Sequence, residues 1–266
     1  MINLDKREKI EHPYPILVVE NILEESFLTE IIGQFPKYEN FIKFKKTMGN
    51  RRFLSNDNPD FYEFIKKNNF WDEFYKEINS QEFYNKILNF LVDEKSENLI
   101  HFSKLKFNET YYRKNKLNYN LSFYTKELTQ KIPRNKIFNL LRFLSKKILY
   151  KHDKSKEGGC YLRFDISSAS NGYFRNPHKD SEGTILAFLI YLEDQINVGG
   201  YGGEFIVHDK NMEISKTFVP KKNKALFFLS NQNSFHSVSK IINANEWRKF
   251  VYGGYTSIDK NIWYNK

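Results

Sequence analysis

The last third of the chain changes its hydrophobic period, and this change constrains the fold more than any other feature. From Cys160 to Tyr255 the sequence consists of short runs rich in β-branched and aromatic residues. Turn residues separate the runs, among them Pro220 and the glycines of 198–205 (VGGYGGEF). Short strands with such breaks predict a sandwich or jelly roll rather than a parallel sheet with crossover helices. The runs are 161–166, 184–192, 204–207, 217–219, 225–229, 236–241 and 248–255.

The first half of the chain carries a helical pattern instead. In 21–34 the apolar residues Leu23, Phe27 and Ile31 recur at the spacing of one helix face. Similar patterns follow at 61–70, 71–91 and 137–149, and a strand is expected at 15–19. A polar, Gly-ended loop at 151–159 then separates the two halves. We therefore predict an α+β fold, in which a supporting helical region (1–158) packs on a mainly β core (159–266) as one compact unit.

Cysteine content and hydropathy bear on the cellular setting. The single cysteine, Cys160, excludes an internal disulfide, as expected in a reducing compartment. The longest apolar run, 185–192 (ILAFLIYL), is far shorter than the roughly 20 residues that a membrane-spanning helix needs. We therefore expect a soluble, cytoplasmic protein with no membrane partner.

The formal net charge of +10 raises the question of an acidic partner. The lysines are scattered, and the best candidates for a basic surface are 43–52 (KFKKTMGNRR) and 146–156 (KKILYKHDKSK). A solvated surface is the preferred interpretation, so nucleic acid is not the expected partner. A catalytically silent module that uses this surface to hold nucleic acid remains the alternative.

Three residues of metal-ligand type stand out in the β-rich part: His178 and Asp180 in NPHKDS, and His236 in NSFHSVS. Two histidines and one carboxylate commonly hold a non-haem iron(II) on one face of an octahedron, which leaves three positions open. His178 and Asp180 are two residues apart, so an extended backbone directs both side chains to the same side. Arg248 follows twelve residues after His236 and adds a fixed cation to the group.

The order of these pieces resembles a known family. GYFRNPHKDS, FLIYLED, GGYGGEF, ALFFLS, SFHSV and WRKF, in this order, resemble the Fe(II)/2-oxoglutarate-dependent dioxygenases, and within them the prolyl-4-hydroxylase-like branch. A weaker match lies in PYPILVVENILEESFLTEI. The resemblance implies that the β core is a double-stranded β-helix, which is a form of jelly roll.

The resemblance also implies residue roles. His178, Asp180 and His236 would bind Fe(II), and Arg248 would pair with the distal carboxylate of 2-oxoglutarate, a task that suits the planar guanidinium. Tyr191 is a second candidate for that carboxylate. Relatives often carry a tyrosine in the strand before HxD, where this chain has Phe164.

The activity implied is hydroxylation of an unactivated C–H bond with 2-oxoglutarate and O2, which releases succinate and CO2. Ascorbate is left open as a reductant. Asp180 favours hydroxylation over halogenation, because a Gly or Ala there would leave room for a halide. The substrate is a prolyl-type peptide or a small molecule, and Arg163 and Asp165 are candidate substrate contacts. A nucleic-acid demethylase with the same iron chemistry is a further alternative, and the sequence does not indicate the oligomeric state.

Overall fold

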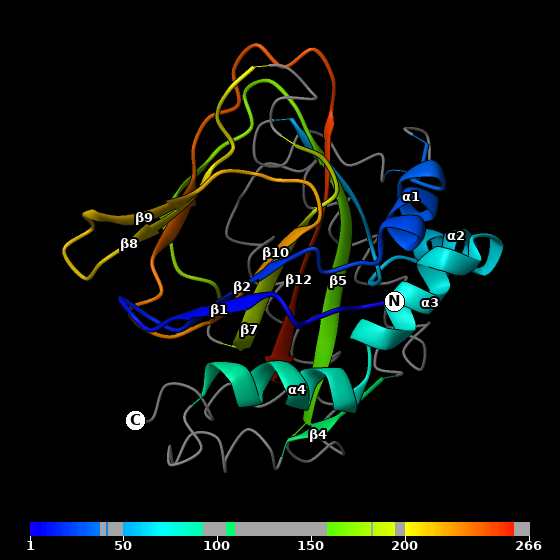
Figure 1. Ribbon diagram of the computed structural model, residues 1–266, viewed down its shortest axis with the longest axis horizontal. Coiled ribbons are helices and arrows are strands. Elements are labelled where there is room, and N and C mark those ends of the chain that lie inside the picture. Colours follow the sequence, from blue (N-terminus) through cyan, green and yellow to red (C-terminus); the bar gives the residue numbers. More distant parts are fainter. Residues whose placement is uncertain are drawn as a thin grey trace, which may run out of the picture.

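The computed structural model describes residues 1–37, 41, 50–92, 105–109, 159–181, 183–194 and 200–257. Within these residues, two antiparallel sheets face each other and helices cover the outer face of the larger sheet (Figure 1). The predicted α+β fold with a jelly-roll core is confirmed.

The larger sheet has β12 (Arg248–Ser257) near its middle, between β7 (Thr184–Tyr191) and β5 (Gly159–Ala169). Its strand order is β1-β2-β10-β7-β12-β5-β3, and β4 (Lys106–Phe107) pairs in parallel with β5. Strand β10 spans Lys224–Leu229. The smaller sheet has the order β6-β11-β8-β9, formed by Arg175–His178, His236–Val238, Phe205–His208 and Ile214–Phe218.

Three strands from the first sixty residues complete the larger sheet. The predicted strand at 15–19 is confirmed as β2 (Ile16–Glu20), which lies between β10 and β1 (Arg7–Ile10). Strand β3 (Arg51–Ser55) pairs with β5 at the other edge and was not predicted. Because these strands belong to the same sheet as the β core, the N-terminal part contributes to the framework of the core as well as to its cover.

Four helices lie in the described part of the chain: α1 (Glu25–Gly33), α2 (Pro59–Lys67), α3 (Asn69–Ile78) and α4 (Gln81–Leu91). The prediction of one helical segment over 71–91 was wrong, because the helix ends at Ile78 and a new helix begins at Gln81. Ser80 starts the new helix, since its hydroxyl accepts a hydrogen bond from the Phe83 amide at 3.1 Å. The helix expected at 137–149 lies outside the described residues.

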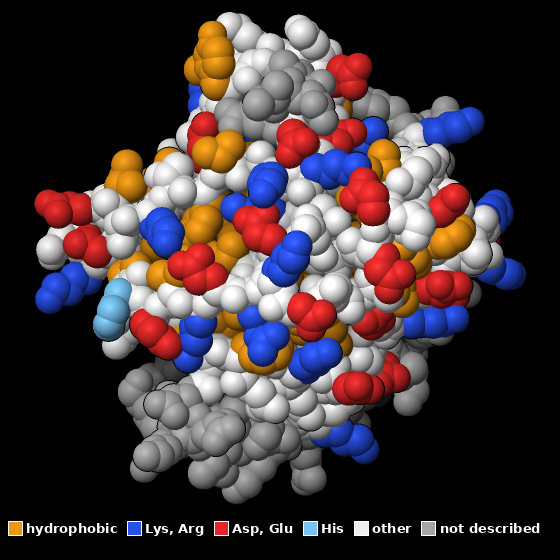
Figure 2. All heavy atoms as spheres, in the orientation of Figure 1, with side chains coloured by type: hydrophobic (Ala, Val, Ile, Leu, Met, Phe, Trp, Pro, Cys, Tyr) orange, Lys and Arg blue, Asp and Glu red, His pale blue; other side chains and the backbone are white. Residues whose placement is uncertain are grey.

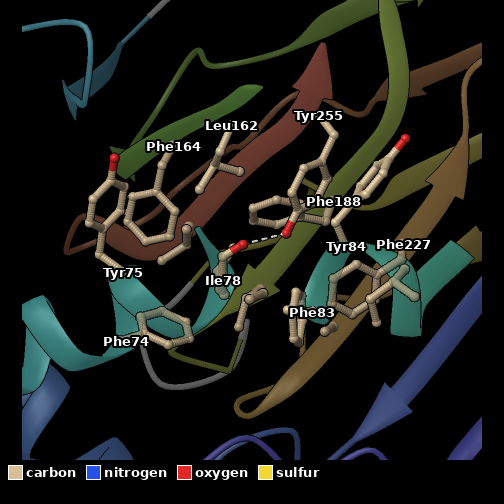
Figure 3. Close-up of a cluster of buried hydrophobic side chains, with 14 of the residues drawn as sticks. Phe74, Tyr75, Ile78, Phe83, Tyr84, Leu162, Phe164, Phe188, Phe227 and Tyr255 are labelled. Carbon is tan, nitrogen blue, oxygen red and sulfur yellow. Dashed lines mark hydrogen bonds between the residues drawn. The ribbon is translucent and has the colours of Figure 1, made fainter. Parts of the chain in front are cut away.

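Side chains of the larger sheet alternate between two hydrophobic layers. On β7, Phe188 and Ile190 face the helices, whereas Leu189 and Tyr191 face the smaller sheet. Figure 3 shows the helix-side layer, where aromatic rings of α3, α4 and the sheet pack together and the Tyr255 hydroxyl bonds the Ile78 carbonyl at 2.5 Å. All eight residues of β7 are buried, so the two layers account for its unbroken apolar run.

The described surface is mixed in charge, and the described helices are short. On the face drawn in Figure 2, acidic and basic side chains are interspersed, in keeping with ion pairs such as Lys224–Glu20 (2.8 Å) and Lys249–Glu193 (2.7 Å). The two candidate basic clusters fall largely outside the described residues. Among the described helices, none has both the length and the apolar character needed to cross a membrane.

Candidate metal centre and the adjoining arginine pocket

The smaller sheet brings the three predicted ligand residues together. Strands β6 and β11 pair so that His178 lies directly opposite His236, and their ring centroids are 4.4 Å apart. Asp180 follows β6 by two residues. One ligand atom from each of the three side chains lies within 4.8 Å of the other two. A single ion can therefore reach all three after a small closing movement of the side chains.

Both histidines are oriented by the backbone just before them. His178 Nδ1 lies 2.8 Å from the Asn176 carbonyl, and His236 Nδ1 lies 2.9 Å from the Ser234 carbonyl. Because a carbonyl oxygen only accepts, each Nδ1 carries the proton and donates it. Each Nε2 then keeps its lone pair, the arrangement that a metal-binding imidazole requires.

Burial keeps both imidazoles neutral. Desolvation lowers the pKa of His178, and the charge of Arg175 lowers it further. Desolvation lowers the pKa of His236 to about 4, against the opposing charge of Asp180. The His236 ring is only 4% exposed and lies against the rings of Phe205 and Phe228, with centroids 5.3 and 4.9 Å away. Protons therefore compete weakly for these nitrogens at neutral pH.

Only one of the two carboxylate oxygens of Asp180 has a hydrogen-bond partner among the described residues. Its Oδ1 accepts a hydrogen bond from the Tyr252 hydroxyl at 3.3 Å. Its Oδ2 is buried and has no hydrogen-bond partner within the described chain. A buried carboxylate oxygen in this state is costly unless a cation lies against it. Two neutral nitrogens and this oxygen form a donor set that suits a divalent transition metal such as Fe(II).

A pocket between the two sheets contains a buried arginine, Arg248, at the start of β12. Its Nη1 donates to the Gly202 carbonyl at 3.0 Å, whereas Nε and Nη2 are buried without a partner in the described part of the structure. Burial lowers the pKa of Arg248, because desolvation disfavours its charge. A ligand with a carboxylate would satisfy both free nitrogens through two parallel hydrogen bonds. The lining residues are Ala169, Tyr173, Leu189, Tyr191, Gly203, Val238, Ile241, Arg248 and Phe250.

The glycines at 202 and 203 allow the backbone to approach Arg248. Both have positive φ angles, +88° and +78°. A Cβ on Gly202 would collide with the Lys240 carbonyl, and a Cβ on Gly203 would collide with Arg248 Nη1. Gly202 and Gly203 therefore form a close passage of the chain over the guanidinium.

Tyr191 and Arg248 were predicted to serve one ligand, and the structure places both in this pocket. Burial raises the pKa of Tyr191 well above its ordinary value, although the charge of Arg248 opposes the shift. The phenol thus remains protonated and able to donate. Tyr173 lines the same pocket and was missed, although it belongs to the GYFRNPHKDS segment that carries His178.

Phe164, which stands where relatives often carry a tyrosine, does not line this pocket. Phe164 is fully buried on the opposite face of the larger sheet, against the rings of Phe61, Phe74 and Tyr75 (Figure 3). Alternation along β5 explains the difference, because neighbouring residues of a strand face opposite sides. On this strand Ala169, and not Phe164, lines the pocket.

Asp165, which was predicted to contact substrate, is engaged in ion pairs within the protein, and its contact with substrate stays a prediction. Its side chain is 0% exposed and accepts hydrogen bonds from Arg51 at 3.1 Å and Arg163 at 2.9 Å. Arg163 is 47% exposed, and its contact with substrate stays a prediction. Arg51 was not predicted, since the partner that fixes it lies 114 residues away in the chain.

Comparisons with known proteins identify a family and a fold. Residues 164–257 match the family model of the 2OG-Fe(II) oxygenase superfamily. No curated protein matches the chain. Among solved structures, a prolyl 4-hydroxylase from Phytophthora capsici is 12% identical, with a TM-score of 0.52 over 91% of this chain and 59% of that chain. This likeness shows the fold.

Two further solved structures are less similar in shape. A prolyl hydroxylase from Trichoplax adhaerens, in complex with a peptide fragment of the hypoxia inducible factor oxygen degradation domain, is 11% identical. Its TM-score is 0.46 over 91% of this chain and 83% of that chain. A prolyl-4-hydroxylase from Pseudomonas putida is 10% identical, with a TM-score of 0.41 over 91% of each chain.

Proposed function

Because residues 164–257 belong to the 2OG-Fe(II) oxygenase superfamily, we propose that His178, Asp180 and His236 hold the Fe(II) of this dioxygenase and that Arg248 binds its 2-oxoglutarate. One observation carries the proposal: the three ligand atoms converge within 4.8 Å of one another, and the buried oxygen of Asp180 lacks any other partner in the described chain. When bound, the iron supplies the redox chemistry that couples decarboxylation of 2-oxoglutarate to oxidation of a C–H bond.

The ligand residues contribute orientation and charge. The carbonyls of Asn176 and Ser234 hold the Nδ1 protons, so both Nε2 atoms face the metal without first losing a proton. Asp180 supplies the single negative charge of the set. Three protein ligands leave three positions open for the co-substrate and O2.

Arg248 and Tyr191 contribute recognition of the distal carboxylate of 2-oxoglutarate. The two free nitrogens of Arg248 provide a fork for the two carboxylate oxygens, and the Tyr191 hydroxyl provides a neutral donor in the same pocket. Leu189, Ile241 and Phe250 make the remaining walls apolar, which excludes water and strengthens the charged pair.

For the substrate we propose a prolyl residue of a peptide. The fold shared with the Phytophthora capsici prolyl 4-hydroxylase supports this choice. The expected product is a hydroxyprolyl peptide with a mass increase of one oxygen atom, formed together with one succinate. Incubation with a library of proline-containing peptides, followed by mass spectrometry, tests this part separately from the metal site.

The metal and co-substrate sites are tested by anaerobic reconstitution. Fe(II) with 2-oxoglutarate should give a visible absorption band, and air should then convert 2-oxoglutarate to succinate. His178→Ala and Asp180→Ala should lose both signals. His12→Ala, which changes an exposed histidine outside the site, should keep both. Absence of the band in the wild type, or its survival in Asp180→Ala, would overturn the proposal.

A further inference from the structure

A chain of contacts connects a buried ion-pair cluster to the metal site. Tyr252 on β12 lies directly opposite Asp165 on β5 in the sheet register. Asp165 in turn holds Arg51 from β3 and Arg163 from its own strand. The hydroxyl of Tyr252 donates a hydrogen bond to Oδ1 of Asp180. The cluster therefore links three strands of the larger sheet to one proposed ligand.

The ion-pair cluster is rigid at its base. Asp165 is 0% exposed and Arg51 is 8% exposed. Arg51 Nη2 also donates to the Ser167 hydroxyl at 2.9 Å, and Arg163 Nη2 donates to Asp165 at 2.9 Å. Charge-assisted hydrogen bonds in a buried setting fix side-chain geometry more firmly than exposed pairs do. Both guanidinium groups are consequently anchored by the same carboxylate.

The two guanidinium groups in turn position the Tyr252 ring. The Arg51 Cζ lies 5.0 Å from the ring centroid, and the Arg163 Cζ lies 5.6 Å from it. These distances are typical of cation–π contacts. The hydroxyl oxygen of Tyr252 lies 3.3 Å from Asp180 Oδ1. Because an ionised carboxylate oxygen only accepts, the Tyr252 hydroxyl is the donor of this hydrogen bond.

We propose that Tyr252 is a positioning residue that makes Asp180 bind the metal through one oxygen. Its hydroxyl donates to Oδ1, which leaves Oδ2, buried and without a partner among the described residues, as the ligand atom. This inference rests on the proposed function, because it takes Asp180 as a metal ligand. Tyr252 acts through Asp180 and is not itself assigned to the reaction.

The number of open positions on the metal explains why this control matters. A carboxylate can bind a metal through one oxygen or through both. Two histidines and a two-oxygen aspartate would occupy four of six octahedral positions, which leaves too few for a chelating co-substrate together with O2. A hydrogen bond to Oδ1 disfavours the two-oxygen mode, because that oxygen would have to give up its donor.

Metal affinity of the apo-protein tests the proposal without turnover. Mn(II) binding is followed by the electron paramagnetic resonance signal of the free ion. Tyr252→Phe should raise the Kd for Mn(II) by about 10- to 100-fold, the usual effect of losing a partner of a metal ligand. Tyr191→Phe removes a hydroxyl from the neighbouring pocket. It should leave the Kd for Mn(II) unchanged and weaken the binding of 2-oxoglutarate. A Tyr252→Phe protein with wild-type Mn(II) affinity and an unchanged carboxylate spectrum overturns the proposal.

Infrared spectroscopy measures whether the Asp180 carboxylate binds the metal through one oxygen or through two. The difference spectrum between the Mn(II) and apo forms, taken with 13C-labelled aspartate, contains the two carboxylate stretches of Asp180. Their separation is wide for binding through one oxygen and narrow for binding through two. We expect a wide separation in the wild type and a narrower one in Tyr252→Phe. A merely structural tyrosine would not change this separation.

Two arginine variants test the support of the ring. Arg163→Gln removes one cation from the ring, and because that side chain is half exposed the fold should survive. Its Kd for Mn(II) should rise by a smaller factor than in Tyr252→Phe. Arg52→Gln changes the next residue along β3, which alternation directs to the other face of the sheet, and should have no effect. An equal effect of both arginine variants would contradict the proposed support.

Asp180→Ala separates failure of this inference from failure of the proposed function. If Asp180→Ala abolishes Mn(II) binding while Tyr252→Phe keeps both the wild-type affinity and the wild-type carboxylate spectrum, then Asp180 is a ligand that needs no positioning by Tyr252, and only the inference fails. If Asp180→Ala itself binds Mn(II) with wild-type affinity, the proposed metal site fails, and the role of Tyr252 fails with it.

Discussion

Replacing Arg248 by methionine should make the apo-protein more stable while destroying its affinity for 2-oxoglutarate. Arg248 is 3% exposed, and of its three guanidinium nitrogens only Nη1 has a hydrogen-bond partner among the described residues. Among the described residues this buried cation is therefore only partly paired, and in the proposed function the carboxylate of 2-oxoglutarate completes the pairing. Methionine has a similar length, fills the same apolar pocket and has no charge to desolvate.

The expected magnitudes follow from these contacts. Replacing buried charged groups by apolar residues of similar volume stabilises proteins by about 1–4 kcal/mol where it stabilises them. The hydrogen bond to the Gly202 carbonyl offsets part of this, since a net bond contributes about 1 kcal/mol. We therefore expect a gain of about 1–2 kcal/mol in the free energy of unfolding. Loss of two charge-assisted hydrogen bonds, each about 1.5–3 kcal/mol, lowers the affinity for 2-oxoglutarate by on the order of 10²- to 10⁴-fold.

Two measurements check both halves of this prediction. Urea denaturation of the metal-free, ligand-free protein gives the free energy of unfolding. Calorimetric titration of 2-oxoglutarate into the Mn(II) form gives the affinity. Arg248→Lys is the matched control, because lysine keeps the positive charge but lacks the two-pronged donor geometry. It should lose affinity without gaining stability.

Two results would refute this reasoning. If Arg248→Met destabilised the apo-protein by more than about 1 kcal/mol, the guanidinium would already be satisfied before the ligand binds. If the affinity fell by less than about tenfold, Arg248 would not be the main partner of the distal carboxylate. Either outcome would move the search for the carboxylate site to other side chains of the pocket.

Three further predictions concern the surroundings of the site. Asp165→Asn leaves a buried arginine without its carboxylate and should cost about 3 kcal/mol of stability or more, measured by urea denaturation. Gly203→Ala should weaken the binding of 2-oxoglutarate, measured by calorimetric titration, and leave Mn(II) binding unchanged, because the new methyl group collides with Arg248. Burial lowers the pKa of His236 to about 4, so the stability that its neutral form contributes is present above the unfolded pKa of about 6.5 and is lost as the pH falls toward 4. The apo-protein should be about 2 kcal/mol less stable at pH 5 than at pH 7.5 from this group, and His236→Gln should flatten that part of the pH dependence in urea denaturation.

The proposed ligand set could be picked out from the sequence because metal chemistry restricts the residue types. Few side chains bind Fe(II), so His178, Asp180 and His236 stand out wherever strands are expected. Arg248 stands out for a similar reason, as a charge at the start of a mainly apolar strand. The β core could be predicted for a different reason, since short apolar runs between turn residues have few other folds available. In both cases the local sequence limits the possibilities before any long-range contact is known.

The supporting residues could not be predicted, because their roles depend on contacts between distant parts of the chain. Tyr252 and Asp180 are 72 residues apart, and Arg51 and Asp165 are 114 residues apart. Nothing in the sequence near Arg51 distinguishes it from Arg52, which belongs to the same strand and the same basic segment. Pairing of β3 with β5 makes the distinction by placing one arginine on the inner face. The face on which Phe164 lies could not be predicted for the same reason, because a shift of one residue exchanges the two faces of a strand.

The register that brings Tyr252 to Asp180 is itself fixed by the two glycines that follow it. In β12, Gly253 pairs with Phe188 of β7, and a Cβ at Gly253 would collide with the Phe188 ring. A Cβ at Gly254 would lie 2.9 Å from the Leu186 carbonyl, which is closer than a real side chain allows. If β12 slipped by one residue in the direction that moves Tyr252 against Phe188, the tyrosine ring would have to occupy space that the Phe188 ring already fills. The YGGY motif therefore disfavours this neighbouring register, and the packing of the helix-side core thereby stabilises the geometry of the proposed metal site on the opposite face of the sheet.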